Sequence, residues 1–219
     1  MFILIAAVFI IGSLFDLHYF TLGANYLLVP ILVLYYRYKA RNWFIFLVLA
    51  LFFFYLRDIF LIHGMSSFHP LALMSFLIGI LILYGFAVTG FPRSKVHFVE
   101  WLSLLIMYGF LGFVFYTMAE LMAEVLTVFE SRAYLFLFLL TLLLAITFTA
   151  YLLKSHYASL WLMLASASLL VSELSLFFKT YVVSDISVNV FYPLFHVITY
   201  YALVEHGLHR RRSSEVPYF

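Results

Sequence analysis

Two acidic side chains, Asp58 and Glu173, lie inside long apolar segments of this 219-residue chain. Asp58 falls in the run from Trp43 to Ile62, and Glu173 falls in the run that begins at Ala165. Placing a carboxyl group at the centre of a membrane helix costs on the order of 3 kcal/mol, so such residues mostly face protein or water and serve a function. If the two acids meet, they form the natural candidate for a reactive site.

The composition indicates a polytopic membrane protein, because 67% of the residues are hydrophobic, 10% are charged and the mean hydropathy is +1.12. A soluble domain of this size could not cover such a composition with a polar surface. The apolar segments leave room for one transmembrane domain, which we place at residues 1–209, followed by a short cytoplasmic tail at 210–219. Cys is absent, which excludes disulfides, thiol nucleophiles and Cys-ligated metals.

Eight apolar segments have, or nearly have, the roughly 20 residues that a helix needs to cross a bilayer. Their continuous apolar character favours helices, so we predict an all-α bundle of about eight transmembrane helices. The first segment lacks the basic region and the cleavage site of a signal peptide, so we expect it to be retained. The expected spans are residues 2–15, 22–36, 43–63, 70–90, 98–119, 133–153, 157–178 and 186–207.

The basic residues fall mostly on one side of this topology. Nine of the twelve follow even-numbered spans: Arg37, Lys39, Arg41, Arg93, Lys95, Lys154 and Arg210, Arg211 and Arg212. By the positive-inside rule, both termini are cytoplasmic. We therefore expect a multi-pass protein of a bacterial inner membrane, in which the C-terminal cluster of His206, His209 and the three arginines touches anionic head groups.

The last span carries a polar stripe. Its members follow one another at three or four positions and therefore line one helix face: Asn189, Tyr192, His196, Thr199 and Tyr200. Asp58 and Glu173 each lie about five residues from the outer ends of their spans, which places the two carboxyls at similar depth. Equal depth is compatible with one shared site.

Two other spans add polar groups. Tyr55 lies one turn before Asp58, and the fifth span places Tyr116, Glu120 and Glu124 on one face, with its two acids near the outer interface. The simplest geometry has these faces converging with the stripe on a polar cavity that opens to the outer half of the bilayer.

Structural interpretations compete with this one. Asp58 could pair with Arg57 or Lys179 only to hold helices together, and the stripe hydroxyls are typical of hydrogen bonds between helices. His196 alone is more often a packing residue than a reacting one. For the two intramembrane acids, a function outweighs a structural role.

Several chemistries lack their motifs. The chain has no HExxH or HxxxH pair, no GxSxG elbow, and no Walker or dinucleotide loop. Its His residues form no recognisable set of zinc ligands. We therefore predict no metal, no cofactor and no nucleic-acid partner.

Five short motifs occur in order along most of the chain: Pro30-Ile31-Leu32, Arg57-Asp58-Ile59-Phe60-Leu61, Phe76-Leu77-Ile78-Gly79 with Tyr84, Ser172-Glu173-Leu174-Ser175-Leu176, and Thr199-Tyr200-Tyr201-Ala202. Through them the chain resembles the YhhN/TMEM86 family of lysoplasmalogenase-like membrane proteins, which also has about eight helices. The chain departs from that family's pattern at four places: Arg57 replaces Gly, Glu173 replaces Asp, Leu81 replaces His, and Val204-Glu205 replaces a Gln.

The resemblance implies a hydrolase that cleaves the vinyl ether of lysoplasmalogens to a fatty aldehyde and a glycerophospho head group. One acid must then donate a proton, and the other must be ionised to stabilise charge and activate water. Two carboxyls in an apolar site resist ionising together, which suits this division. We expect Glu173 to be the donor and Asp58 the base. Residues expected to orient the acids or bind a lipid or lysolipid substrate are Arg57, Tyr55, His196, Thr199, Tyr200 and Tyr201.

Two other classes of function stay open. A non-catalytic relative that binds a lipid or other ligand, or serves as a scaffold, is favoured by the departures at positions 57, 81 and 173. It would be supported if each acid paired with a basic residue. A small proton-coupled transporter would also use intramembrane carboxyls, although no inverted repeat or broken helix is visible.

Overall fold

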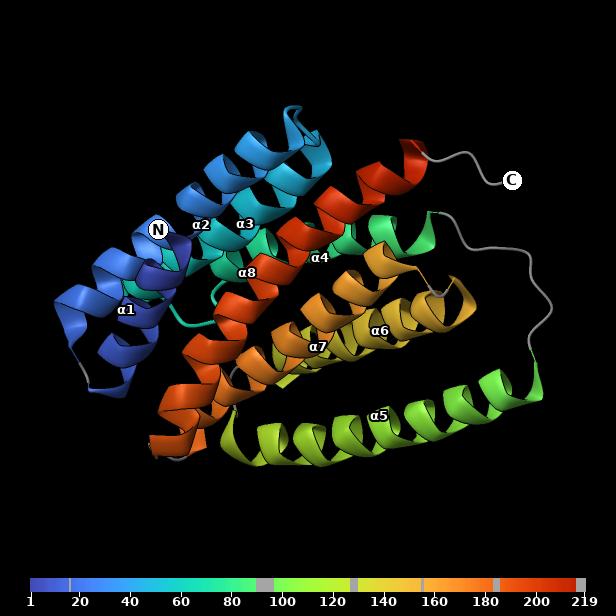
Figure 1. Ribbon diagram of the computed structural model, residues 1–219. Helices are drawn as coiled ribbons and strands as arrows, with labels where there is room; N and C mark the ends of the chain where they lie inside the picture. The colour runs from blue at the N-terminus through green and yellow to red at the C-terminus, as the bar shows by residue number, and fades with distance from the viewer. Residues whose placement is uncertain (16, 90–96, 127–129, 155, 183–185, 216–219) are drawn as a thin grey trace.

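The computed structural model describes residues 1–15, 17–89, 97–126, 130–154, 156–182 and 186–215. Within these ranges the fold is all-α, and it contains eight α-helices, as the apolar segments predict (Figure 1). In chain order they are α1 (Phe2–Leu14), α2 (His18–Ala40), α3 (Ile45–Ile62), α4 (Pro70–Val88), α5 (Phe98–Val125), α6 (Glu130–Lys154), α7 (Tyr157–Phe177) and α8 (Ile186–Glu215). A π-helical turn, η1 (Phe178–Val182), extends α7.

Six helices of the described chain, α2 to α7, are long and apolar enough to cross a bilayer, which supports a multi-pass integral membrane protein. The other two differ from them in character. α1 is apolar but has only 13 residues, and α8 carries polar and charged groups along its 30 residues. The crossing of the bilayer by α1 and α8 stays a prediction, and so does the cytoplasmic location of both termini.

Several helices run past the ends of the apolar segments. α2 continues to Ala40, so that Arg37 and Lys39 occupy its last turn, where cations interact favourably with the helix dipole. α5 continues to Val125, and α8 continues to Glu215, beyond the expected tail boundary at 209. Hydropathy predicts where the apolar part of a helix ends, but the helical backbone hydrogen bonds continue beyond that point. Arg93 and Lys95 lie outside the described residues, as do the side chains of Lys154, Arg211 and Arg212.

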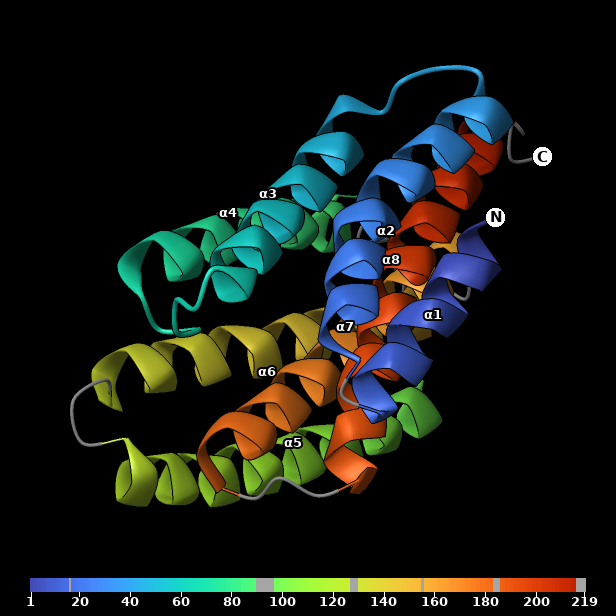
Figure 2. The same ribbon diagram turned by 90° about the vertical axis from the view of Figure 1, so that its left-hand side faces the viewer.

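α8 is the central element of the bundle. It packs most extensively on α7 and also contacts α1, α2 and α3 (Figures 1 and 2). α3 pairs with α4, α6 lies between α4 and α7, and α5 runs along the outside of α6. The faces of α3, α7 and α8 that carry polar residues are therefore turned toward one another inside the bundle.

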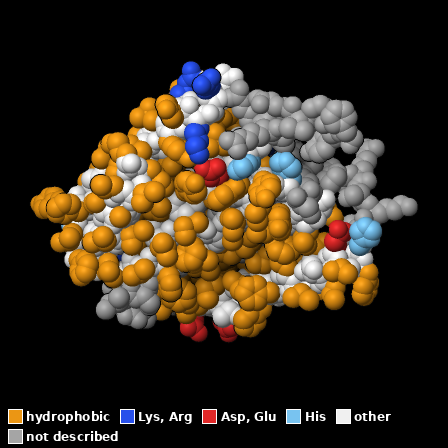
Figure 3. Space-filling view, in the orientation of Figure 1, with side chains coloured by type: hydrophobic (Ala, Val, Ile, Leu, Met, Phe, Trp, Pro, Cys, Tyr) orange, Lys and Arg blue, Asp and Glu red, His pale blue; other side chains and the backbone are white. Residues whose placement is uncertain are grey.

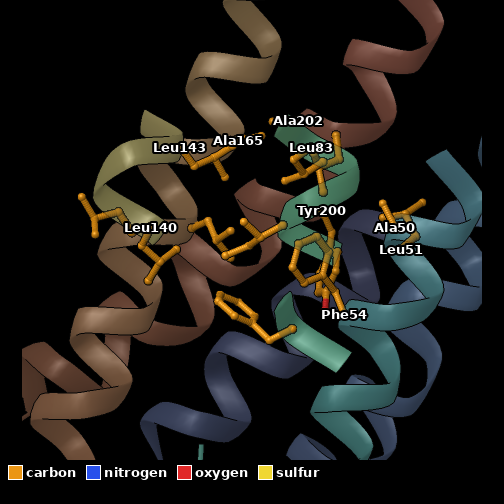
Figure 4. Packing of buried hydrophobic residues seen from close by; sticks show 14 of the residues in the cluster. Ala50, Leu51, Phe54, Leu83, Leu140, Leu143, Ala165, Tyr200 and Ala202 are labelled. Atoms are coloured by element: carbon orange, nitrogen blue, oxygen red, sulfur yellow. The ribbon is translucent and has the colours of Figure 1, made fainter. Parts of the chain in front are cut away.

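The apolar core fills the space where α3, α4, α6, α7 and α8 meet (Figure 4). Small residues let these helices approach closely, and the completely buried ones include Ala50, Ala165 and Ala202. Leu83 and Leu140 fill the gaps between them. Such close packing holds the backbone positions from which buried polar side chains project.

The surface of the bundle is apolar, as expected for contact with lipid. Hydrophobic side chains cover most of the face seen in Figure 3, and Lys and Arg side chains gather at its upper edge. α5 is the most exposed of the long helices, with large apolar side chains such as Phe98, Trp101 and Phe110 on its surface. The hydrocarbon of a bilayer is the simplest environment for these groups.

Close packing between α3 and α4 makes Gly79 sensitive to substitution. A Cβ added at Gly79 would stand 2.8 Å from a ring carbon of the buried Phe54. We expect Gly79→Ala to destabilise the purified protein by about 1–3 kcal/mol through overpacking. Thermal unfolding in detergent measures this effect. Gly85→Ala is the matched control, because nothing lies within 4 Å of its added Cβ; equal losses in both variants would contradict the packing argument.

Candidate functional site

Arg57 of α3 and Glu173 of α7 form a two-pronged ion pair inside the bundle. Nη1 of Arg57 donates to Oε1 of Glu173 at 2.6 Å, and Nη2 donates to Oε2. The two residues are only 2% and 3% exposed. Both carboxylate oxygens accept from the guanidinium, which is the bidentate geometry of strong arginine–carboxylate pairs.

Aromatic rings complete the surroundings of Arg57. The guanidinium carbon lies 4.7 Å from the centre of the Phe76 ring and 6.0 Å from that of Phe136. The two rings stack on each other with centres 4.6 Å apart. A cation over an aromatic face is attracted by the ring quadrupole, and the attraction is largest where water is excluded. α4 and α6 thus supply the apolar half of the arginine's site.

Asp58 uses one carboxylate oxygen for two partners on α8. Nε2 of His196 lies 3.1 Å from Oδ2, and the hydroxyl of Tyr200 donates to the same atom. His196 and Tyr200 are one helical turn apart, and their rings meet edge to face. The other oxygen, Oδ1, lies 3.9 Å from Nη1 of Arg57 and has no hydrogen-bond partner in the described structure.

The structure therefore brings Asp58 and Glu173 into one buried ionic cluster, with Arg57 between them. We define this cluster as Arg57, Asp58, Glu173, His196 and Tyr200. Glu173 serves as the counter-ion of Arg57, which differs from its expected role as the proton donor. The physical reason is geometric, because the guanidinium occupies both oxygens from which an acidic proton would be given.

Three predicted site residues direct their hydroxyls or rings elsewhere. Tyr55 donates to the backbone carbonyl of Tyr26 at 3.1 Å. Thr199 donates to the carbonyl of Phe195 within its own helix. Tyr201 packs away from the cluster, because consecutive residues of a helix point about 100° apart.

The contacts of Tyr201 lie on a different face of α8 from those of Tyr200. Its ring stacks on Phe2 of α1 and meets Trp161 of α7 edge to face. Tyr55, Thr199 and Tyr201 could contact a bound molecule only beyond the ionic cluster, and their predicted binding roles stay predictions.

The N-terminal part of the α8 stripe also packs inside the bundle. Ser13 of α1 donates to the backbone carbonyl of Asn189 at 3.3 Å, and Ser172 of α7 donates to that of Tyr192 at 3.3 Å. The Tyr192 ring lies against the His196 ring at 5.4 Å. These contacts continue the polar face of α8 from the ionic cluster toward its N-terminal end.

The expectation that the fifth span contributes to this site is wrong. Tyr116, Glu120 and Glu124 are exposed on the surface of α5. α5 packs chiefly on α6, which separates it from α3 and α8 (Figure 1). Their spacing correctly predicts a shared helix face, but that face is turned away from the bundle.

The sequence predicts that His206 touches anionic head groups at the membrane surface. In the structure it is buried inside the bundle and only 3% exposed. Its Nδ1 donates to the carbonyl of Ala158 at 2.7 Å, and its ring stacks on Phe86. Arg210 lies over the rings of Phe44 and Phe86. These side chains join α8 to α3, α4 and α7.

A second polar cluster centres on Glu205, which in the sequence stands out only as a departure from the pattern of the YhhN/TMEM86 family. Tyr35 donates to its carboxylate at 3.4 Å, and Lys39 and His209 lie 3.9 and 3.8 Å from it. Glu205 is 7% exposed. Its spacing of four residues from His209 is the signal that could have suggested a paired acid.

Among the described residues, no group of three or more His, Asp or Glu side chains could hold a metal ion. Comparison of the chain with protein-family models, with curated proteins and with solved structures gave no match. The fold and the site thus define a multi-pass all-α membrane protein with a buried ionic cluster. The resemblance to the lysoplasmalogenase-like family stays a prediction.

The ion pair makes a prediction about stability. Glu173→Gln removes the bidentate counter-ion of the buried Arg57 guanidinium and leaves Asp58, 3.9 Å from Nη1, as its nearest carboxylate, which is expected to cost about 3–5 kcal/mol. Unfolding of the purified protein by heat or by SDS measures the loss. Ser175→Ala is the control, because the Ser175 hydroxyl bonds only to the Val171 carbonyl of its own helix.

A double variant separates lost pairing from general damage. Arg57→Met combined with Glu173→Leu removes both charges and is expected to be more stable than either single variant. A double variant whose loss equals the sum of the two single losses would show that the pair is not coupled.

Proposed function

We propose that this chain is an integral-membrane hydrolase of the lysoplasmalogenase type. It would cleave the vinyl ether of a lysoplasmalogen to a fatty aldehyde and a glycerophospho head group. The observation that carries the proposal is Asp58, a buried acid whose Oδ2 is held by His196 and Tyr200, while Oδ1 has no hydrogen-bond partner among the described residues. An oriented acid with one uncommitted oxygen is suited to proton transfer.

The charges of the ionic cluster decide which of its side chains can act as the acid. Arg57 and Glu173 cancel each other, and an uncompensated charge is strongly unfavourable in such an interior. Nε2 of His196 lies 3.1 Å from Oδ2 of Asp58, which is close enough for a proton to pass between the two side chains. The acid role thus falls to the Asp58–His196 pair, and Glu173 keeps Arg57 neutralised.

The reaction balances with water alone. The shared proton passes to the vinyl carbon remote from the ether oxygen, and the electron pair of the double bond forms the new C–H bond. Water adds to the resulting oxocarbenium carbon and returns a proton to the Asp58–His196 pair. The hemiacetal hydroxyl then loses its proton as the aldehyde C=O bond forms, the C–O bond to glycerol breaks, and the glycerol oxygen takes up a proton through the Asp58–His196 pair, so that aldehyde and alcohol leave. Neutralisation of Arg57 by Glu173 keeps an unpaired cation away from the oxocarbenium ion.

A substrate needs a route to these side chains, since each member of the ionic cluster is at most 3% exposed. α1 covers the polar face of α8, with the Phe9 ring 5.8 Å from that of His196 and the Phe2 ring stacked on Tyr201 (Figure 2). α1 is short and packs on α2 and α8. We place lipid entry between α1 and α8.

A non-catalytic, ligand-binding or scaffolding protein is the second candidate. It is favoured by the pairing of Glu173 with Arg57 and of Asp58 with His196, because each acid then faces a basic residue in an enclosed site. The stability of such a protein would still depend on the Arg57–Glu173 ion pair, but the protein would release no product from any lysolipid.

Enzyme assays separate the two candidates. Purified protein is incubated with vinyl-ether and ester lysolipids, and aldehyde and fatty acid are measured. We expect aldehyde from the vinyl-ether lipids, and we expect Asp58→Asn to lower its release by at least about 100-fold, the usual contribution of a general acid. Ser175→Ala is the control, since the Ser175 hydroxyl bonds to a backbone carbonyl of its own helix. Absence of turnover with every lysolipid would refute the hydrolase.

The proposal includes eight crossings with both termini in the cytoplasm, which the absence of Cys makes simple to test. Tyr38, at the end of α2, and His63, after α3, are both exposed. Single variants Tyr38→Cys and His63→Cys are treated with a membrane-impermeant maleimide in intact cells and in inverted vesicles. We expect His63→Cys to react from outside and Tyr38→Cys only from the cytoplasmic side. Reaction of both from one side would contradict this topology.

A further inference from the structure

Two prolines lie inside helices, and each leaves one backbone carbonyl of its own helix without a donor. Proline has no N–H, so the carbonyl four residues earlier loses its helical hydrogen bond. In α2 this is the carbonyl of Tyr26, four residues before Pro30, and in α8 it is that of Asn189, four residues before Pro193. An unpaired carbonyl is unfavourable in an apolar interior, so each carbonyl needs a donor from elsewhere.

A neighbouring helix supplies a hydroxyl to each of these carbonyls. Tyr55 of α3 donates to the carbonyl of Tyr26 at 3.1 Å, and Ser13 of α1 donates to that of Asn189 at 3.3 Å. Ser13 and Asn189 are only 5% and 9% exposed. The same arrangement thus occurs twice in the bundle, and Ser13 completes a hydrogen bond that α8 cannot make within itself.

The bond from Ser13 lies beside the ionic cluster. The Phe9 ring lies 5.8 Å from the His196 ring, and Ser13 follows Phe9 by about one turn of α1 (Figure 2). Apolar ring contacts have no preferred direction, whereas a hydrogen bond to one particular carbonyl does. The bond from Ser13 is therefore suited to fix the position in which α1 covers the cluster.

We propose that α1 is a lid over the ionic cluster and that the Ser13 hydroxyl is its latch. The latch closes on the carbonyl that Pro193 leaves open in α8. When α1 lifts, this carbonyl loses its donor, so the bond favours the closed position. Lifting of α1 makes Asp58 and His196 accessible. The lid and its latch depend on these contacts, and only the identification of a lysolipid as the molecule admitted rests on the proposed function.

A single cysteine at position 6 measures the opening of the lid, because the chain has no Cys of its own. Ala6 is 7% exposed and lies three residues before Phe9 on the same helix face. The full-length Ala6→Cys protein in detergent is expected to react with N-ethylmaleimide only when α1 lifts. Leu4→Cys, at a position of α1 that is 67% exposed, is the control that reacts without opening.

The latch predicts how the reaction rate depends on Ser13. In the Ala6→Cys protein, Ser13→Ala is expected to speed the reaction about fivefold, the value of one hydrogen bond, and to leave the Leu4→Cys rate unchanged. Pro193→Ala restores a backbone donor within α8. In that background the added Ser13→Ala is expected to change the rate by less than about twofold.

A second pair of variants isolates the hydroxyl if Pro193→Ala does not fold. Ser13→Thr and Ser13→Val have nearly the same shape, and only the first keeps a hydroxyl. In the Ala6→Cys protein, Ser13→Val is expected to react about fivefold faster than Ser13→Thr.

The latch is supported if Pro193→Ala abolishes the effect of Ser13→Ala, or if the Thr and Val variants differ as expected. An unchanged rate, an equal increase in both backgrounds, equal Thr and Val rates, or an equal increase in Leu4→Cys overturns it. Because labelling needs no lipid substrate, an inactive protein with a working latch would refute only the hydrolase, and an active enzyme without this coupling would overturn only the latch.

Discussion

The bidentate pair between Arg57 and Glu173 is the interaction on which the interior of this bundle depends. Each residue alone would place a full charge in an apolar environment, and neither would be tolerated there without the other. The pair joins α3 to α7, and the stacked rings of Phe76 and Phe136 bring α4 and α6 to the same point. Four helices thus meet around one neutralised cation.

Once Arg57 is neutralised, Asp58 becomes the chemically distinctive group. It lies next to Arg57 in the sequence, yet its hydrogen bonds run to α8 through His196 and Tyr200. The cluster therefore has two parts, an ion pair that stabilises and an acid with one uncommitted oxygen. The hydrolase and the scaffold differ in which part matters, because a scaffold needs only the ion pair and a hydrolase also needs the acid.

The enclosure of the cluster constrains any function that involves a ligand. Side chains that are nearly inaccessible cannot meet a lipid without movement of a covering element. α1 is the smallest helix and the one that lies over the α8 stripe, with apolar rings facing His196 and Tyr201. Among the described residues, its displacement would break apolar packing, the ring contacts and the bond from Ser13 at this face, whereas opening α7 from α8 would disturb the most extensive interface of the bundle.

Sequence alone determined the helical class, the eight segments and the two acids, because hydrophobicity and intramembrane charge are local properties. It also identified the stripe of α8, since a spacing of three or four fixes a helix face. Only the tertiary structure decided that Arg57 turns to Glu173, that Tyr201 and the α5 acids face elsewhere, and that Glu205 centres a second cluster. Partner choice depends on how helices far apart in the sequence rotate and pack, which no local pattern contains.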